Sequence, residues 1–281
     1  MNPVTNYCVT GKNLEVCNGM NRIEKKFKEL KKVRQKAFIA FITAGYPNLS
    51  ITEKLIRKFD KSGVDIIELG VPFSDPMADG PVIQEASQWA LKKNTRLIDV
   101  LNLVKKLRKN ITCPILLMTY YNPIFCFGDD KFIKRAVQSG VDGVIIPDLP
   151  PDEGRDFIRK ANKSGLTNIC FVSPTTNIKR IKFISLAAKG FIYYVSLTGV
   201  TGMRKTLASN LRQNIKTIKR YTDKPVCVGF GVSNRIQVKE VGKIADGVIV
   251  GSAIVGKIKE NINNPCLIKR VGRFVQGLKR R

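Results

Sequence analysis

The sequence predicts an α/β fold in which eight parallel strands close into a single barrel surrounded by helices. Eight short apolar runs recur along the chain, and each is continuous rather than alternating, as strands are when both faces of a parallel sheet are buried. Segments with helical periodicity separate these runs. Strands that alternate with helices over about 220 residues are typical of a (β/α)8 TIM barrel. The chain has 281 residues and is 43% hydrophobic, which is sufficient for one such domain.

Apolar, β-branched composition marks the eight strands. In chain order they are expected over residues 37–43, 64–69, 113–119, 141–147, 168–173, 191–196, 225–230 and 245–251.

Helices are expected between these strands because apolar residues recur there at helical spacing. Ser50 and Glu53 form a capping box that is expected to begin the helix after the first strand. The long gap after the second strand has room for an extra helix over 81–93, ahead of the regular one over 97–107. Gly140 is expected to end a later helix.

An open, doubly wound sheet is the alternative arrangement of the same elements. Such sheets bind dinucleotides through a G-x-G-x-x-G turn after the first strand. This chain reads TAGYPN at that place, so the closed barrel is favoured.

The chain is strongly basic, with 49 Lys and Arg against 22 Asp and Glu and a net charge of +27. This charge would attract nucleic acid or another polyanion. The basic residues are scattered over most predicted helices rather than gathered with aromatic residues, so we expect solvated helix faces and no nucleic-acid partner. A small phosphorylated substrate would also gain from the positive field.

The chain contains no histidine, which excludes histidine-dependent acid–base chemistry and histidine metal sites. Its seven cysteines are widely spaced without a C-x-x-C pair, so we expect buried, reduced thiols and no metal site. No apolar run has the roughly 18 to 20 residues that span a bilayer, and the N-terminus lacks the apolar core of a secretory signal. We therefore expect a cytoplasmic protein without a membrane partner.

Acidic side chains concentrate where the second predicted strand ends, in ELGVPFSDPMADGP. The active site of such a barrel lies at the carboxyl ends of its strands. Glu68 ends an apolar strand, and apolar surroundings raise the pKa of a carboxyl group, so this residue can exchange protons near neutral pH. Asp79 lies at the far end of the loop. The structural alternatives are an acid paired with a lysine for Glu68 and a helix N-cap for Asp79.

Glycine-rich loops follow the sixth, seventh and eighth strands, and each one opens a helix. Helix N-termini expose backbone N–H groups and favour anions, and the last two loops are the usual phosphate position in this fold. We expect phosphate binding by Gly202, Gly231, Gly251 and Ser252. The alternative is that these loops are tight turns that need glycine for their conformation alone, since such turns would have the same sequence pattern.

ELGVPFSDPMADGP resembles the signature of the tryptophan synthase α subunit family. Other segments resemble the family at successive strand ends, in the same order: AFIAFITAGYP, PILLMTYYNPI, DGVIIPDLPPDE, YYVSLTGVTGMR, VGFGVS and VIVGSAIV. The resemblance runs from about residue 20 to about residue 275 and implies a TIM barrel with an extra N-terminal helix. Residues 1–19 have no counterpart in the family pattern. They are expected to be a disordered extension or to precede the true start, which leaves 20–281 as the catalytic domain.

The resemblance implies a lyase of amino-acid biosynthesis that cleaves indole-3-glycerol phosphate by a retro-aldol reaction into indole and D-glyceraldehyde 3-phosphate. Glu68 matches the acid–base glutamate of the family, and Asp79 matches the aspartate that binds the indole N–H. Tyr193 matches a tyrosine that helps to position the substrate. Thr201 matches the loop threonine that approaches the loop of Asp79 when the site closes. The apolar indole pocket of the family matches Phe41, Met118, Ile145 and Val172.

The resemblance also implies a partner, a β subunit that carries pyridoxal phosphate and converts indole to L-tryptophan within an α2β2 heterotetramer. The residues that would face it are Pro72, Asp75 and Asn122. No cofactor is implied for this chain itself.

Three other functions remain open at this point. An α-like chain could only activate a β subunit, although the intact carboxylates and phosphate loops argue against that. The second is a different phosphate-binding barrel, such as a sugar-phosphate isomerase or an indole-glycerol-phosphate synthase. The synthase would need a catalytic lysine on an early strand, and the first two strands hold none. Nucleic-acid binding is the third, and it predicts salt-dependent binding to any duplex.

Overall fold

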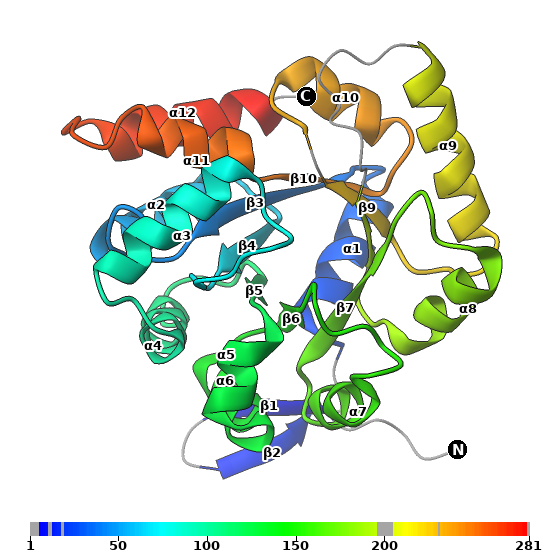
Figure 1. Cartoon of the computed structure of the whole chain (residues 1–281), viewed down its shortest axis with the longest axis horizontal. Helices are drawn as coiled ribbons and strands as arrows, with labels where there is room; N and C mark the ends of the chain where they lie inside the picture. The colour runs from blue at the N-terminus through cyan, green and yellow to red at the C-terminus, as the bar shows by residue number, and fades with distance from the viewer. Residues whose placement is uncertain (1–5, 11–12, 18–19, 196–204, 230, 280–281) are drawn as a thin grey trace.

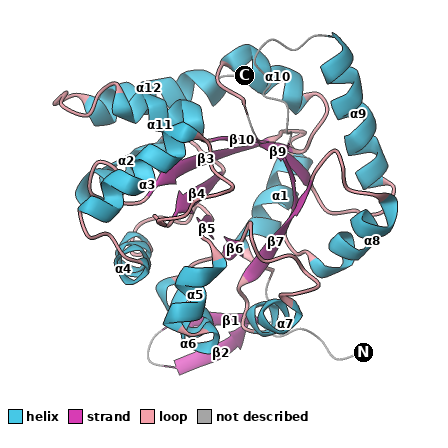
Figure 2. Ribbon diagram, viewed as in Figure 1, coloured by secondary structure: helices cyan, strands magenta, loops and turns pink. Residues whose placement is uncertain are grey.

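The computed structural model describes residues 6–10, 13–17, 20–195, 205–229 and 231–279, and it describes side chains from residue 20 onward except for 205–209. Eight parallel strands close into a barrel in the order β10-β3-β4-β5-β6-β7-β8-β9. Helices surround these strands (Figures 1 and 2). The predicted closed barrel is therefore confirmed, and the open sheet is excluded.

Each barrel strand overlaps its predicted run. The strands are β3 (Ala37–Thr43), β4 (Ile66–Gly70), β5 (Ile115–Met118), β6 (Gly143–Ile145), β7 (Thr167–Val172), β8 (Ile192–Val195), β9 (Val226–Gly229) and β10 (Gly247–Val250).

A two-stranded antiparallel sheet pairs β1 (Asn6–Thr10) with β2 (Asn13–Cys17), outside the barrel. These strands lie in the stretch that the sequence analysis separates from the catalytic domain. The division of the chain at residue 19 stays a prediction.

Twelve helices are present in the described part of the chain. They are α1 (Arg22–Lys32), α2 (Leu49–Lys61), α3 (Pro81–Lys92), α4 (Leu97–Leu107), α5 (Tyr121–Phe127), α6 (Asp129–Ser139), α7 (Arg155–Lys163), α8 (Ile178–Ala187), α9 (Lys205–Lys219), α10 (Arg235–Gly242), α11 (Ser252–Lys259) and α12 (Leu267–Lys279).

Two of these helices are the predicted additions to the barrel, and two others, α5 and α12, were not predicted. Helix α1 precedes the first barrel strand, and α3 is the extra helix after the second. Helix α5 is a short helix that begins shortly after β5 ends, and α12 follows α11. Within the described residues, no helix has both the length and the apolar character that crossing a membrane requires.

The start of α2 differs from the sequence prediction. Asn48 is the N-cap, and its side chain accepts a hydrogen bond from the backbone N–H of Ile51 at 2.9 Å. Glu53 instead forms ion pairs with Arg57 and Lys106. The predicted capping box of Ser50 and Glu53 was therefore wrong, because an asparagine two residues earlier is an equally good cap.

Helix α1 covers the amino-terminal end of the barrel. Its buried face consists of Ile23, Phe27 and Leu30, which join the cluster of side chains inside the barrel. The rings of Phe27 and Phe191 lie 5.7 Å apart, and Phe191 directly precedes β8. Helix α1 therefore closes the barrel interior at this end.

Three aspartates stabilise the amino-terminal ends of the strands in the same way. Each one lies just before an even strand of the barrel and accepts a hydrogen bond from a backbone N–H at the start of the preceding strand. The pairs are Asp65 with Phe38 at 2.8 Å, Asp142 with Ile115 at 2.8 Å and Asp246 with Val226 at 3.0 Å.

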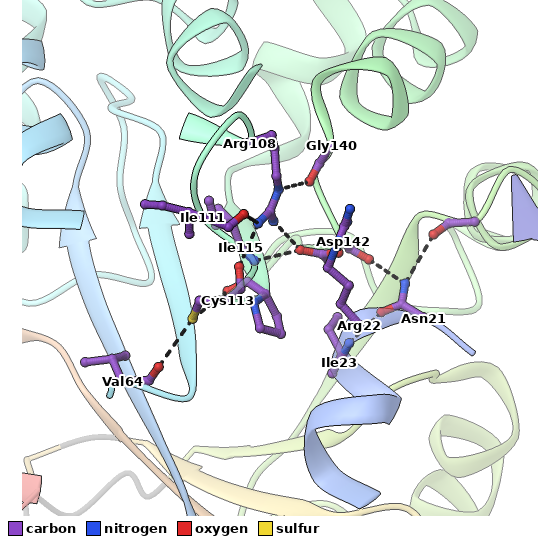
Figure 3. A network of polar contacts seen from close by, with 12 residues as sticks. Asn21, Arg22, Ile23, Val64, Arg108, Ile111, Cys113, Ile115, Gly140 and Asp142 are labelled. Carbon is purple, nitrogen blue, oxygen red and sulfur yellow. Dashed lines mark hydrogen bonds and ion pairs between the residues drawn. The ribbon is translucent and has the colours of Figure 1, made fainter. Parts of the chain in front are cut away.

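Asp142 is the centre of the largest of these networks (Figure 3). Its carboxylate forms ion pairs with Arg22 at the start of α1, at 2.8 Å, and with Arg108 at the end of α4. Arg108 also donates to the carbonyl oxygens of Gly140, Ile111 and Cys113. This network links α1 and α4 to the amino-terminal end of the barrel.

Candidate active site

A cavity of about 600 Å³ lies at the carboxyl ends of the strands. Eight of the residues that the sequence singled out line it: Phe41, Glu68, Asp79, Met118, Tyr193, Gly231, Gly251 and Ser252. They come from six different strands or the loops after them, so only the closed barrel brings them together.

Glu68 is fully buried in β4, where it pairs with Phe41 on β3 and Leu116 on β5. Within the described residues, neither of its carboxylate oxygens has a hydrogen-bond partner. Burial, together with the negative charge of Asp79, raises the pKa of Glu68 to about 8. The carboxyl group is therefore protonated at neutral pH and can give its proton to a bound molecule.

Asp79 ends the loop that follows β4 and is partly buried at the mouth of the cavity. Burial raises its pKa to about 6, and the hydroxyl of Tyr120 acts in the opposite direction by donating a hydrogen bond to Oδ2 at 3.0 Å. Asp79 is therefore mostly ionised at neutral pH. Gly80, the N-cap of α3, supplies no side-chain cap. Asp79 is thus not the helix cap of the structural alternative, and the two acids carry different charges.

The middle of the cavity is apolar. Its walls include Phe41, Met118, Phe171 and Ile249. Gly70 makes room for the Phe41 ring, because a Cβ atom at Gly70 would lie 2.7 Å from that ring. A flat aromatic group fits between such walls.

Two predicted wall residues do not line the cavity. Val172 is buried in the cluster outside the barrel, and its neighbour Phe171 takes the predicted position, because successive side chains of a strand point to opposite faces. Ile145 points into the barrel but lies deeper, and Pro147 lines the cavity above it.

Tyr193 on β8 lines the cavity beside Glu68. Burial, and after it the charge of Glu68, raises its pKa well above the ordinary value, so the hydroxyl remains protonated. Gly229 on β9 pairs with Val195, and a Cβ atom at Gly229 would lie 2.5 Å from the Tyr193 hydroxyl, so glycine leaves the room that this hydroxyl needs.

The opposite side of the cavity is suited to an anion. Helix α11 begins there at Ser252, and its N-cap, Gly251, offers no side-chain hydrogen bond to the first turn. Gly231 lines the same side and has a φ of 70°, a conformation that favours glycine. Exposed backbone N–H groups at a helix N-terminus bind phosphate without a basic side chain. Thr201 and Gly202, also predicted for this region, lie outside the described residues.

The predicted partner-facing residues differ in exposure. Asp75 and Asn122 are exposed, but Pro72 is buried. Two large apolar side chains are exposed in the same segments: Met77, in the loop after β4, is 82% exposed, and Phe125, in α5, is 67% exposed. Pro72 is therefore not available to a partner in this conformation.

Sequence reasoning missed several residues that shape the site, among them Tyr120, Ile83, Phe171 and Ile249. The strand alternation that places Phe171 was available, whereas no local pattern indicates that Tyr120 reaches a loop 41 residues away.

Comparisons with known proteins agree with this geometry. The family model described as tryptophan synthase alpha chain matches residues 27–279. A tryptophan synthase alpha chain from Geotalea uraniireducens is 48% identical over 260 residues, which cover 92% of this chain and 97% of the relative. The one from Thermoanaerobacter sp. is 44% identical and covers 92% and 99%.

Solved structures show the same similarity. Tryptophan synthase subunit alpha from Legionella pneumophila superposes with a TM-score of 0.87 at 40% identity, covering 92% of this chain and 97% of that one. A chain of the tryptophan synthase α2β2 complex from Pyrococcus furiosus superposes with a TM-score of 0.79 at 38% identity, covering 86% and 97%.

Proposed function

Because this chain belongs to the tryptophan synthase alpha chain family, we propose that it cleaves indole-3-glycerol phosphate to indole and D-glyceraldehyde 3-phosphate. One observation carries the proposal. A single cavity holds a protonated buried acid, an ionised acid, apolar walls and an open helix N-terminus. These match the ring carbon, the ring nitrogen, the indole ring and the phosphate of that substrate.

Binding would place the two ends of the substrate at opposite sides of the cavity. The phosphate would accept hydrogen bonds from the first turn of α11, beside Gly251 and Ser252, and the indole ring would lie between Phe41 and Met118. Binding energy from the phosphate, which does not react, would orient the bond that breaks.

The reaction would begin with proton transfer from Glu68 to carbon 3 of the indole ring. Protonation there makes the ring a cation with its charge centred on the nitrogen. The ionised carboxylate of Asp79 would accept a hydrogen bond from the ring N–H and stabilise this charge, an effect that is strong in a site shielded from water.

Glu68 would then act as a base. Having lost its proton, it is a buried carboxylate with a raised pKa, and it would take the proton of the hydroxyl on the adjacent side-chain carbon. That carbon becomes the aldehyde of glyceraldehyde 3-phosphate. The electron pair of the broken carbon–carbon bond returns to the ring, which leaves as neutral indole. Tyr193 would help to hold the substrate in place.

The proposal includes a β subunit as partner, in an α2β2 assembly that receives the indole. The similar Pyrococcus furiosus chain supports it, because that protein is described as part of an α2β2 complex with mutual activation. The docking surface would include Asp75 and Met77 in the loop after β4 and Asn122 and Phe125 in α5, and the two apolar side chains among them are exposed. This chain would need no cofactor of its own, and a cytoplasmic location is part of the proposal.

The test is to supply indole-3-glycerol phosphate to the purified chain and to measure both products. Indole and glyceraldehyde 3-phosphate should appear in equal amounts, faster when a β subunit of the family is added. The contrary result is a folded chain that yields no indole in either condition, yet accelerates tryptophan formation by the β subunit from added indole. That result would show that the chain is an activator of the β subunit and not an enzyme.

A further inference from the structure

Tyr120 joins two loops at the mouth of the cavity. It directly follows Thr119 after β5 and is the N-cap residue of α5. Only 3% of it is exposed, and it is not among the residues that line the cavity. It lies behind Asp79, so it can act on a bound molecule only through that residue.

The hydroxyl group of Tyr120 has two hydrogen bonds with fixed directions. The backbone N–H of Ala78 donates to it at 3.0 Å, and an N–H group cannot accept. The hydroxyl therefore acts as acceptor toward Ala78 and directs its own proton to Oδ2 of Asp79, at 3.0 Å. The acid and the residue before it are thus held by one oxygen atom.

Both partners of this hydrogen bond are themselves fixed. The Tyr120 ring packs against Phe73 with ring centroids 5.2 Å apart. The next residue, Tyr121, is held through its backbone N–H by Asp148 at 2.9 Å. On the other side, Gln84 donates to the carbonyl oxygen of Asp79 at 2.9 Å. Rigid support of this kind is what holds a functional carboxylate in one rotamer.

We propose that Tyr120 is a positioning residue: its hydroxyl, oriented by the Ala78 amide, holds Oδ2 of Asp79 so that Oδ1 is presented to the N–H of the substrate ring. Within the described residues, no hydrogen bond occupies Oδ1. The role of Asp79 toward a ring N–H rests on the proposed function, but the hydrogen bond by which Tyr120 orients Asp79 does not.

The hydrogen bond from Tyr120 also lowers the pKa of Asp79. A donor to an ionised carboxylate favours the charged form, and here it acts against the burial that raises the pKa of Asp79. Tyr120 therefore does two things at once, because it sets both the orientation of the carboxylate and the pH at which it becomes ionised.

A purely structural role is the competing explanation, in which Tyr120 only ties the two loops together. Tyr120→Phe retains the ring packing and removes one oxygen atom. Tyr121→Phe is the matched control, since it removes a neighbouring hydroxyl that bonds Asp129 at 3.1 Å and does not reach Asp79. Only the first substitution should change the titration of Asp79.

The first measurement is the ¹³C titration of the Asp79 carboxyl group by NMR in the full chain, with its signal assigned by its loss in Asp79→Asn. In Tyr120→Phe the midpoint should move to a pH about one unit higher, the size expected for one lost charge-assisted hydrogen bond. Tyr121→Phe should titrate as the wild type does. An unchanged midpoint in Tyr120→Phe would overturn the proposal, whether or not the chain proves to be an enzyme.

The second measurement is the pH profile of indole release. Tyr120→Phe should lower kcat/KM at pH 7 about tenfold, and the acid limb of its profile should move up in pH with the titration of Asp79. A loss of activity that is equal at every pH would mean that Tyr120 supports only the loops, which also contradicts the proposal. If the Asp79 titration shifts in Tyr120→Phe as expected but the wild type releases no indole, the proposed function is contradicted and the role of Tyr120 toward Asp79 is not.

Discussion

Glu68 and Asp79 line the same cavity from the two ends of one loop, and the charge of Asp79 adds to the burial that raises the pKa of Glu68. The first is protonated near neutral pH and the second is mostly ionised. A pair of carboxyl groups separated in this way can divide proton donation and charge stabilisation between them.

The first prediction concerns the pH dependence of kcat/KM in the free chain. Activity requires ionised Asp79, so it should fall as the pH drops through about 6. It also requires protonated Glu68, so it should fall as the pH rises through about 8. Indole release measured from pH 5 to 9 should therefore give a bell-shaped profile. A rate that keeps rising beyond pH 9 would contradict the role of Glu68 as first proton donor.

The second prediction concerns the cost of burying Glu68. Its pKa is raised from 4.5 in the unfolded chain to about 8 in the folded one. The folded state therefore retains a proton that the unfolded state loses, and stability falls as the pH rises between these two values.

Glu68→Gln removes this pH dependence. The unfolding free energy of the variant minus that of the wild type should grow by up to about 1.4 kcal/mol per pH unit between pH 5 and 8. Urea unfolding at three pH values in this window measures the difference. Glu240→Gln is the control and should show no such growth, because the Glu240 side chain on α10, which pairs with Lys243, is 42% exposed and not buried as Glu68 is. Equal slopes for Glu68→Gln and the wild type would mean that Glu68 is ionised in the folded state.

The third prediction separates anion binding from helix stability at α11. Ser252→Asp places a negative charge at the first helical position, where it should stabilise the chain by about 0.3 to 1 kcal/mol through the helix dipole. The same charge should repel the substrate phosphate and raise KM at least about tenfold.

Ile178→Asp is the matched control for Ser252→Asp. It places the same charge at the first position of α8, where the side chain is 50% exposed and does not line the cavity. The thermal unfolding temperature should rise in both variants, while KM should rise only in Ser252→Asp. An unchanged KM in Ser252→Asp would exclude the N-terminus of α11 as the phosphate site.

The fourth prediction concerns the closed end of the barrel. Asp142→Ala would leave the guanidinium of Arg108, only 10% exposed, without its charge partner. Removing one member of a buried ion pair costs about 3 to 5 kcal/mol. Asp156→Ala breaks the exposed pair with Arg159, in which the Asp156 side chain is 81% exposed, and should leave the unfolding temperature close to that of the wild type. Similar unfolding temperatures for the two variants would show that the Asp142 network contributes no more to stability than an exposed ion pair does.

Much of the barrel could be predicted from the sequence because its strands are buried on both faces and therefore read as continuous apolar runs. Helix α5 could not, since a seven-residue helix containing Pro123 has too few turns to show an apolar stripe. The cap of α2 was misplaced because Asn48 and Ser50 are both good N-caps, and only the backbone conformation decides between them.

The site was predictable where a residue contradicts its surroundings. Glu68 is recognisable as a carboxyl group within an apolar strand, and Gly251 as a glycine between a strand and a helix. The apolar wall was harder, since Phe171 and Val172 are both apolar and only the direction of the strand decides which one faces the cavity. Tyr120 was not predictable, because its function comes from a contact between two loops.

The most direct test of the central claim is the rate of indole release from indole-3-glycerol phosphate by the wild type, Glu68→Gln and Asp79→Asn, with Glu240→Gln as the control. Glu68→Gln cannot transfer a proton and should lose at least about 10²- to 10⁴-fold in kcat. Asp79→Asn retains the shape of the side chain without its charge and should lose about 10²-fold or more. Glu240→Gln should match the wild type. Indole release by Glu68→Gln at the wild-type rate would contradict the assignment of this cavity as the site of the chemistry.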